Sequence, residues 1–273
     1  MFTEELAELV LIVDDVGRSA RFYKDVVGLS PEGEPDDEWA WFWAGEPGRA
    51  QRLALHKGRL LFEEESPLPD GERWGRVHYA FRVPRTKLEE ATNHVREKGN
   101  EVYGPVYLDW MGPFRTTFTI PTVTSSSSGP LTCRPPNPQG EPTMNARGLV
   151  WLGTRTRNFD DTVRFFKDTL GLHAVHEEPD FTVLKLPNGD TVEVFGPGDV
   201  GHEHFDIGPV AGFLVDDVAR ARADLEVAGI SFIGPVHEAD DGGSWSHFRG
   251  PDGNVYEITI PAPDGPQARR REQ

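Results

Sequence analysis

Cysteine is almost absent from this chain of 273 residues, which contains only Cys133. A single cysteine excludes an intrachain disulfide and any zinc site built from several thiolates. Basic residues are also scarce, because 28 Lys and Arg stand against 45 Asp and Glu, for a formal net charge of −17. This balance argues against nucleic acid or an anionic membrane as the main partner, since both attract clustered cations.

Long apolar runs are missing as well, and no segment reaches the length that a membrane-spanning helix needs. The N-terminus lacks the basic region that opens a secretory signal. The three arginines at 269–271 are typical of a solvated tail. We therefore expect a soluble, cytoplasmic protein with one or two globular domains.

The chain repeats itself. The run RFYKDVVGL at 21–29 returns as RFFKDTLGL at 164–172, and EVYGPV at 101–106 returns as SFIGPV at 231–236. Because the repeated runs keep the same order, they predict two related domains. The expected boundaries are a first domain at 1–120, an irregular Ser/Pro-rich linker at 121–146, a second domain at 147–262 and a tail at 263–273.

Each domain is divided into two similar halves. A half begins with an apolar run typical of a strand, continues with a helical pattern, and ends in short strand-like runs. Asp15 and Asn158 stand at helix N-cap positions, and Gly28 and Gly171 at left-handed helix ends. The strand-like runs are WAWFWA, QRLALH and RLLFEE in the first unit, then FTVLKL and TVEVFG in the third. The pattern predicts an α+β fold made of four βαβββ units.

Three motifs carry a resemblance to a known family: SARFYKD at 19–25, HYAFRV at 78–83 and PDGNVYE at 251–257. Together they resemble the vicinal oxygen chelate superfamily, which includes glyoxalases, extradiol dioxygenases and bleomycin- or fosfomycin-resistance proteins. The resemblance covers nearly the whole chain. It implies two glyoxalase-like domains, each a cupped mixed sheet with flanking helices. It implies no single function, because the superfamily contains many enzymes and some proteins that only bind.

The first domain lacks the motif that ends the second. PDGNVYE maps, 130 residues earlier, onto PTVTSSS at 121–127. In the neighbouring reading frame the codons permit H-D-P-D-G-N-x-x-E-L at that place. We therefore hypothesise a frameshift near residues 116–118, natural or from sequencing, that cost the first domain its last strand. The alternative is a genuine Ser/Pro-rich linker.

A metal site in the first domain is implied by the resemblance. In the superfamily one divalent ion is held by side chains from the first, fourth, fifth and eighth strands of a domain. These positions fall on Glu8, near Leu60, on His78 and near Ser127, where the lost Glu would stand. Glu8 and His78 are thus a partial candidate site for an Fe, Mn, Ni or Zn ion. Equally, Glu8 can be a solvated residue and His78 an ordinary strand residue.

The second domain offers a different set, because the same positions fall on Trp151, Glu193, Val210 and Glu257. Two of the four are apolar, which favours a metal-free binding domain whose pocket contains Trp151, Glu193 and Glu257. Two buried carboxylates repel unless one is protonated or each has a local partner. We favour local partners.

Two functions remain open, and under neither of them does the sequence identify a catalytic residue. The first is a metal-dependent glyoxalase, lyase or dioxygenase with its site in the first domain, acting on a small oxygen-rich or aromatic molecule. The second is metal-free binding of a small molecule, of the drug-sequestering kind. The domains would pair within the chain or the chain would form a homodimer. The pair His202 and His204, two residues apart in a Gly-rich segment, leaves a metal-binding role open, but we favour a solvated loop.

Overall fold

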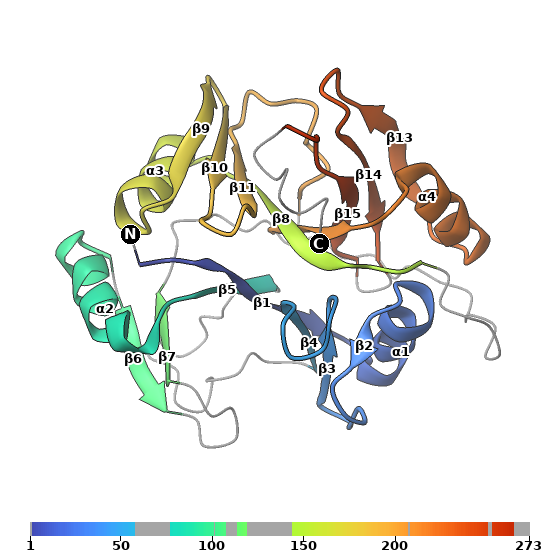
Figure 1. Cartoon of the computed structure of the whole chain (residues 1–273), viewed down its shortest axis with the longest axis horizontal. Helices are drawn as coiled ribbons and strands as arrows, with labels where there is room; N and C mark the ends of the chain where they lie inside the picture. Colours follow the sequence, from blue (N-terminus) through green and yellow to red (C-terminus); the bar gives the residue numbers. More distant parts are fainter. Residues whose placement is uncertain are drawn as a thin grey trace.

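The computed structural model describes residues 2–57, 77–100, 102–107, 114–118, 144–206, 208–250 and 253–264. It confirms an α+β fold of two domains, which lie one above the other in Figure 1. The first half of domain 1 consists of β1 (Glu5–Val13), α1 (Val16–Arg21), η1 (Phe22–Val26), β2 (Ser30–Pro31), β3 (Trp39–Trp43) and β4 (Arg52–Lys57). The second half contains β5 (Val77–Arg82), η2 (Arg85–Lys87), α2 (Leu88–Glu97), β6 (Val102–Tyr107) and β7 (Phe114–Phe118).

Domain 2 repeats this order of elements. Its first half consists of β8 (Gly148–Arg155), α3 (Phe159–Arg164), η3 (Phe165–Thr169), β9 (His173–Glu178), β10 (Phe181–Lys185) and β11 (Thr191–Phe195). Its second half consists of β12 (Val210–Leu214), α4 (Val218–Val227), β13 (Phe232–Glu238), β14 (Ser244–Arg249) and β15 (Val255–Ile260). The strands form one sheet in the order β13-β14-β15-β12-β8-β11-β10-β9. The two halves meet where β8 and β12 pair antiparallel.

The sheet of domain 1 is divided into two parts. One has the order β2-β3-β4-β1-β5, and the other is the β6-β7 pair. In domain 2, β15 stands between β12 and β14, whereas no strand of the described residues stands between their counterparts β5 and β7. Residues 119–143, where the lost strand was predicted, lie outside the described residues. The frameshift therefore stays a hypothesis.

Two of the strands, β2 and β9, were not predicted from the sequence. Including β2 changes which strand is the fourth in the first half of domain 1. The short β2 and the polar β9 have no clear alternation of apolar residues, because each is an edge strand with one neighbour. With β2 included, the fourth strand of the first half is β4, which overlaps the run QRLALH at 51–56. The run RLLFEE and Leu60 lie outside the described residues.

Helix ends follow the expected local chemistry. The side chain of Asp15 accepts a hydrogen bond from the backbone N–H of Arg18, at 2.8 Å, and so caps α1. After η1, Gly28 has φ of 80°, in the left-handed region. A Cβ atom there would overlap the carbonyl of Met144, so glycine also lets the start of domain 2 pack against the end of this helix.

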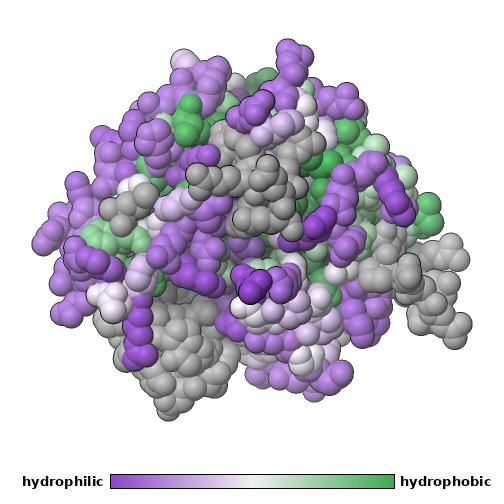
Figure 2. Space-filling view, in the orientation of Figure 1, coloured by the Kyte–Doolittle hydropathy of each residue, from purple (hydrophilic) through white to green (hydrophobic). Residues whose placement is uncertain are grey.

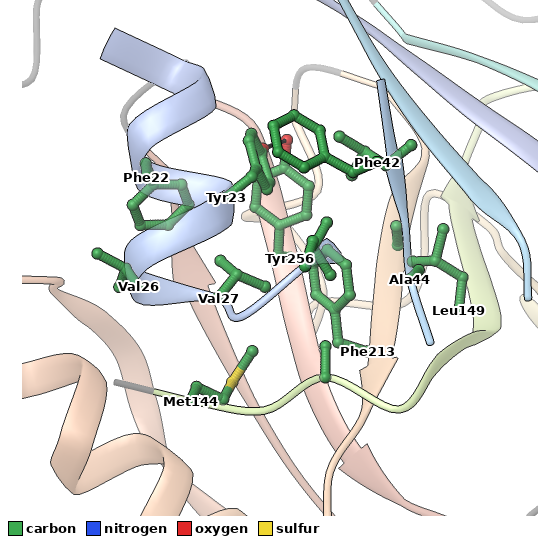
Figure 3. Close-up of a cluster of buried hydrophobic side chains, with 14 of the residues drawn as sticks. Phe22, Tyr23, Val26, Val27, Phe42, Ala44, Met144, Leu149, Phe213 and Tyr256 are labelled. Carbon is green, nitrogen blue, oxygen red and sulfur yellow. Dashed lines mark hydrogen bonds between the residues drawn. The ribbon is translucent and has the colours of Figure 1, made fainter. Parts of the chain in front are cut away.

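One hydrophobic core joins the two domains. It contains Leu9, Tyr23 and Phe42 from domain 1 together with Phe213 and Tyr256 from domain 2. Figure 3 shows Tyr23 extending from its helix toward Phe42 and Tyr256, and the hydroxyl groups of the two tyrosines are 2.7 Å apart. The face of each sheet that carries these residues is called the inner face below, and the opposite one the outer face.

The face of the molecule seen in Figure 2 is predominantly polar where its residues are described. Hydrophilic residues cover most of the face seen in Figure 2, and hydrophobic ones form small separate patches. Among the described residues, no helix is long and apolar enough to cross a membrane.

Candidate functional site

Glu8 lies on the outer face of domain 1 in a closed environment, with 2% of its surface exposed. Directly opposite, on the parallel strand β4, stands Arg52. One guanidinium nitrogen of Arg52 lies 3.3 Å from Oε2 of Glu8, and another lies 3.2 Å from Oε2 of Glu32. The carboxylate of Glu8 is therefore neutralised by a cation of the chain itself. A metal ion placed at Glu8 would be repelled by that guanidinium.

Two of the three tryptophans of β3, Trp41 and Trp43, lie against the guanidinium of Arg52. Ala40 and Phe42 of the same strand are buried, so the alternation places Trp39, Trp41 and Trp43 on the outer face. The guanidinium of Arg52 lies over the Trp41 ring, 4.9 Å from its centroid. Trp39 and Trp41 are stacked, with centroids 5.3 Å apart. These contacts hold Arg52 in position through cation–π attraction.

The other predicted positions of domain 1 do not add ligands within the described residues. His78 pairs with Val10, two residues along β1 from Glu8, and Glu8 itself pairs with Ala80. Only the backbone of His78 is described. On β4 the residue opposite Val10 is Ala54, so this position in the fourth strand has no donor atom in its side chain.

Trp151 fills the corresponding position of domain 2. Its ring lies against the backbone of Gly153, where a Cβ atom would overlap ring carbon Cη2. Gly212 on β12 also makes room, because a Cβ atom there would come within 2.9 Å of the Cβ of Trp151. Phe195 and Phe205 contact the indole edge, with centroids 6.5 and 6.1 Å away. The first-strand position is thus occupied by an apolar ring.

Glu193 and Glu257 lie beside Trp151, and each has a local partner. The indole N–H of Trp151 donates a hydrogen bond to the half-buried Glu193. Glu257 is 5% exposed, and its Oε2 is 3.0 Å from Nε2 of His247. Burial raises the pKa of each carboxyl to about 8, and for Glu193 the charge of Glu257 adds to the effect. Both carboxyls therefore keep their protons to a higher pH than an exposed glutamate does.

His202 and His204, expected in a solvated loop, lie against the outer face of domain 2 instead. Nε2 of His204 is 3.1 Å from Nδ1 of His247, and Nδ1 of His202 is 3.0 Å from Asp199. The ring of Phe205 lies beside both, 5.0 Å from the ring of His202 and 4.8 Å from that of His204. Burial lowers the pKa of His204 and His247 to about 4, so both are neutral at pH 7.

These displaced pKa values predict how stability varies with pH. The two carboxyls stabilise the fold most below their ordinary pKa of 4.5, and this contribution is lost as the pH rises through about 8. His204 and His247 act oppositely, since stability grows as the pH rises from about 4 to 6.5. Between about pH 6.5 and 8.5 only the carboxyl effect remains, so the free energy of unfolding in urea should fall. Glu257→Gln should reduce the fall, and a flat profile would contradict the assignment.

The family of the chain follows from comparison with known proteins. Residues 5–119 and 148–258 match the model of the Glyoxalase/Bleomycin resistance protein/Dioxygenase superfamily. The chain belongs to this superfamily. A search of curated proteins finds no match to it.

Solved structures of the glyoxalase and dioxygenase superfamily share the two-domain fold. The Mn(II)-bound glyoxalase from Novosphingobium aromaticivorans is 22% identical, with a TM-score of 0.66 over 94% of this chain and 82% of its own. The 2,3-dioxygenase LapB from Pseudomonas sp. KL28 is 15% identical, with a TM-score of 0.68 over 96% and 94%. The E323L mutant of homoprotocatechuate 2,3-dioxygenase from Brevibacterium fuscum is 14% identical, with a TM-score of 0.61 over 96% and 72%.

A divalent metal ion, which the glyoxalase relative carries, does not fit the side chains that the structure describes. In domain 2, the side chains of Trp151 and the buried Val210 have no atom that can coordinate a metal ion. The carboxyl of Glu257 is hydrogen-bonded to His247. In domain 1, Glu8 is engaged with Arg52. Over the described ranges, no group of three or more His, Cys, Asp or Glu side chains is placed to hold a metal ion.

Proposed function

We propose that the protein binds a small aromatic molecule with oxygen substituents on the outer face of domain 2, without a metal ion. The observation that carries this is the ring of Trp151, which fills the first-strand position and is held there by Gly153 and Gly212. An indole ring at this position can stack on an aromatic ligand, but it cannot coordinate a metal ion. The activity is that of a drug-sequestering binder.

Polar groups beside the ring would orient such a ligand. Burial favours the protonated form of Glu193, and in that form the carboxyl can donate a hydrogen bond, which an ionised carboxylate cannot. His204 is half-buried and lies near Arg249. The guanidinium of Arg249 forms an ion pair with Asp206, at 3.1 Å. Hydroxyl, carbonyl or carboxylate oxygens on the ligand would match these donors.

Entry of a ligand would require a movement. Trp151 and Phe205 are 5% and 4% exposed. Phe205 belongs to the segment that follows β11, and it contacts both Trp151 and His247. We infer that the segment from Gly196 to Asp206 moves away from the sheet when a ligand binds.

Calorimetric titration with homoprotocatechuate, the compound named for one structural relative, tests the assignment to domain 2. We expect wild type to bind it and Trp151→Leu to bind about tenfold more weakly, since an aromatic contact contributes about 0.5–1.5 kcal/mol. Trp43→Leu in domain 1 is the matched control and should bind like wild type. Equal affinities of wild type and Trp151→Leu, a loss confined to Trp43→Leu, or no binding by wild type would contradict the proposal.

The metal-dependent alternative in domain 1 has one supporting observation, the likeness to the Mn(II)-bound glyoxalase. Under it, Glu8 and His78 would hold an Mn, Fe, Ni or Zn ion for lyase or dioxygenase chemistry. The ion pair of Glu8 with Arg52 opposes this assignment. Metal-free binding in domain 2 is therefore the better supported function.

A further inference from the structure

Three side chains form a continuous hydrogen-bonded chain on the outer face of domain 2. Glu257 on β15 is 3.0 Å from Nε2 of His247, and Nδ1 of His247 on β14 is 3.1 Å from Nε2 of His204. His247 is 3% exposed and uses both ring nitrogens, whereas His204 is half-buried. The chain thus runs from a buried acid to a ring near the surface.

Donor and acceptor roles along this chain are linked. A neutral imidazole has one N–H donor and one acceptor nitrogen. If Glu257 is protonated, its O–H donates to Nε2 of His247, Nδ1–H of His247 donates to Nε2 of His204, and His204 carries its own proton on Nδ1. If Glu257 is ionised, all three roles reverse, and Nδ1 of His204 becomes an acceptor. Neither arrangement needs a charged imidazole.

We propose that Glu257, His247 and His204 form a proton relay, whose outer atom, Nδ1 of His204, exchanges one proton with a weakly acidic ligand. The ligand class is an aromatic compound with an ionisable hydroxyl group, such as a phenol or catechol. The identity of this ligand rests on the proposed function, whereas the relay itself is a property of the free protein. A relay lets a buried acid act on a molecule that it does not touch.

The proton transfer is balanced without an oxidant or reductant. With Glu257 ionised, the O–H bond of the ligand breaks and an N–H bond forms at Nδ1 of His204. The proton on Nε2 of His204 passes to Nδ1 of His247, and the proton on Nε2 of His247 passes to Glu257. The ligand becomes a phenolate, and one negative charge has moved to it from Glu257. The reverse sequence protonates a bound phenolate.

Charged and titratable neighbours favour neutral rings in this chain. His237 on β13 and His202 lie close enough for their positive forms to disfavour charge on the relay histidines. Arg249 has the same effect on His204, and Asp206 opposes it. Glu193 on β11 is another acidic side chain, and the charge of Glu257 acts on its carboxyl. The surroundings therefore disfavour a relay that passes through a charged imidazole.

Nitrogen-15 NMR of histidine-labelled protein without ligand tests the relay directly. We expect the rings of His204 and His247 to exchange tautomers together in one step as the pH rises through about 8, with neither ring becoming charged. In Glu257→Gln this step should be absent from both rings, because the amide cannot lose the proton. His237→Gln, which alters a neighbour outside the chain, should keep the step.

Independent titration of the two rings, an unchanged tautomer of His204, or a step that persists in Glu257→Gln would overturn the relay. Should Glu257→Gln fail to fold, His247→Gln serves instead, and His204 should then lose its step near pH 8. These outcomes do not depend on any ligand. A relay without binding of homoprotocatechuate would refute the proposed function alone, and binding without the linked tautomers would refute the relay alone.

Discussion

Replacing Arg52 with Ala is expected to lower the free energy of unfolding by about 3–5 kcal/mol, because it leaves the carboxylate of Glu8 buried without its cation. Glu8 is 2% exposed and Arg52 lies 3.3 Å away, so water cannot replace the guanidinium fully. Urea denaturation measures the change. Arg49→Ala is a suitable control, since its ion pair with Glu46 is exposed at both ends and contributes about 0–1 kcal/mol.

A second variant separates charge from packing at this site. Glu8→Gln combined with Arg52→Met removes both charges and keeps side chains of similar length, so it should recover most of the stability lost in Arg52→Ala. If Arg52→Ala is as stable as wild type, the carboxylate does not depend on the guanidinium. That result would contradict our interpretation of domain 1, in which the guanidinium of Arg52 keeps a metal ion away from Glu8.

Replacing Gly153 with Val is expected to abolish ligand binding and to destabilise the fold by about 1–3 kcal/mol, as overpacking of a core does. The added side chain would overlap the ring of Trp151 and push it off the sheet. Calorimetry with homoprotocatechuate and urea denaturation measure the two effects.

Gly148→Ala on the same strand is the matched control for Gly153→Val. A Cβ atom at Gly148 would meet Cγ1 of Val150 at 3.6 Å, an ordinary contact, so stability and binding should stay near those of wild type. Unchanged binding in Gly153→Val would show that the Trp151 ring does not form the binding surface.

The fold could be predicted from the sequence because repeats and periodicity are local signals. The repeated runs that contain Gly28 and Gly171 identified the repeated helix, and the run WAWFWA identified β3. Edge strands β2 and β9 escaped prediction, since with a single neighbour they need little apolar surface.

The site was harder to predict because its contacts join distant parts of the chain. Glu8 was identified as a candidate ligand, but its pairing with Arg52 depends on the register of two parallel strands. His204 and His247 are 43 residues apart, and only the fold of the segment after β11 brings them together. A pattern of residue types at fixed spacing contains neither fact.

The central claim is that binding in domain 2 needs no metal ion, and one titration tests it most directly. Homoprotocatechuate should bind with equal affinity to protein kept in EDTA and to protein supplied with Mn(II) or Fe(II), because the Trp151 ring occupies the first-strand position. Binding that is lost in EDTA and restored by a stoichiometric amount of either metal would contradict the account.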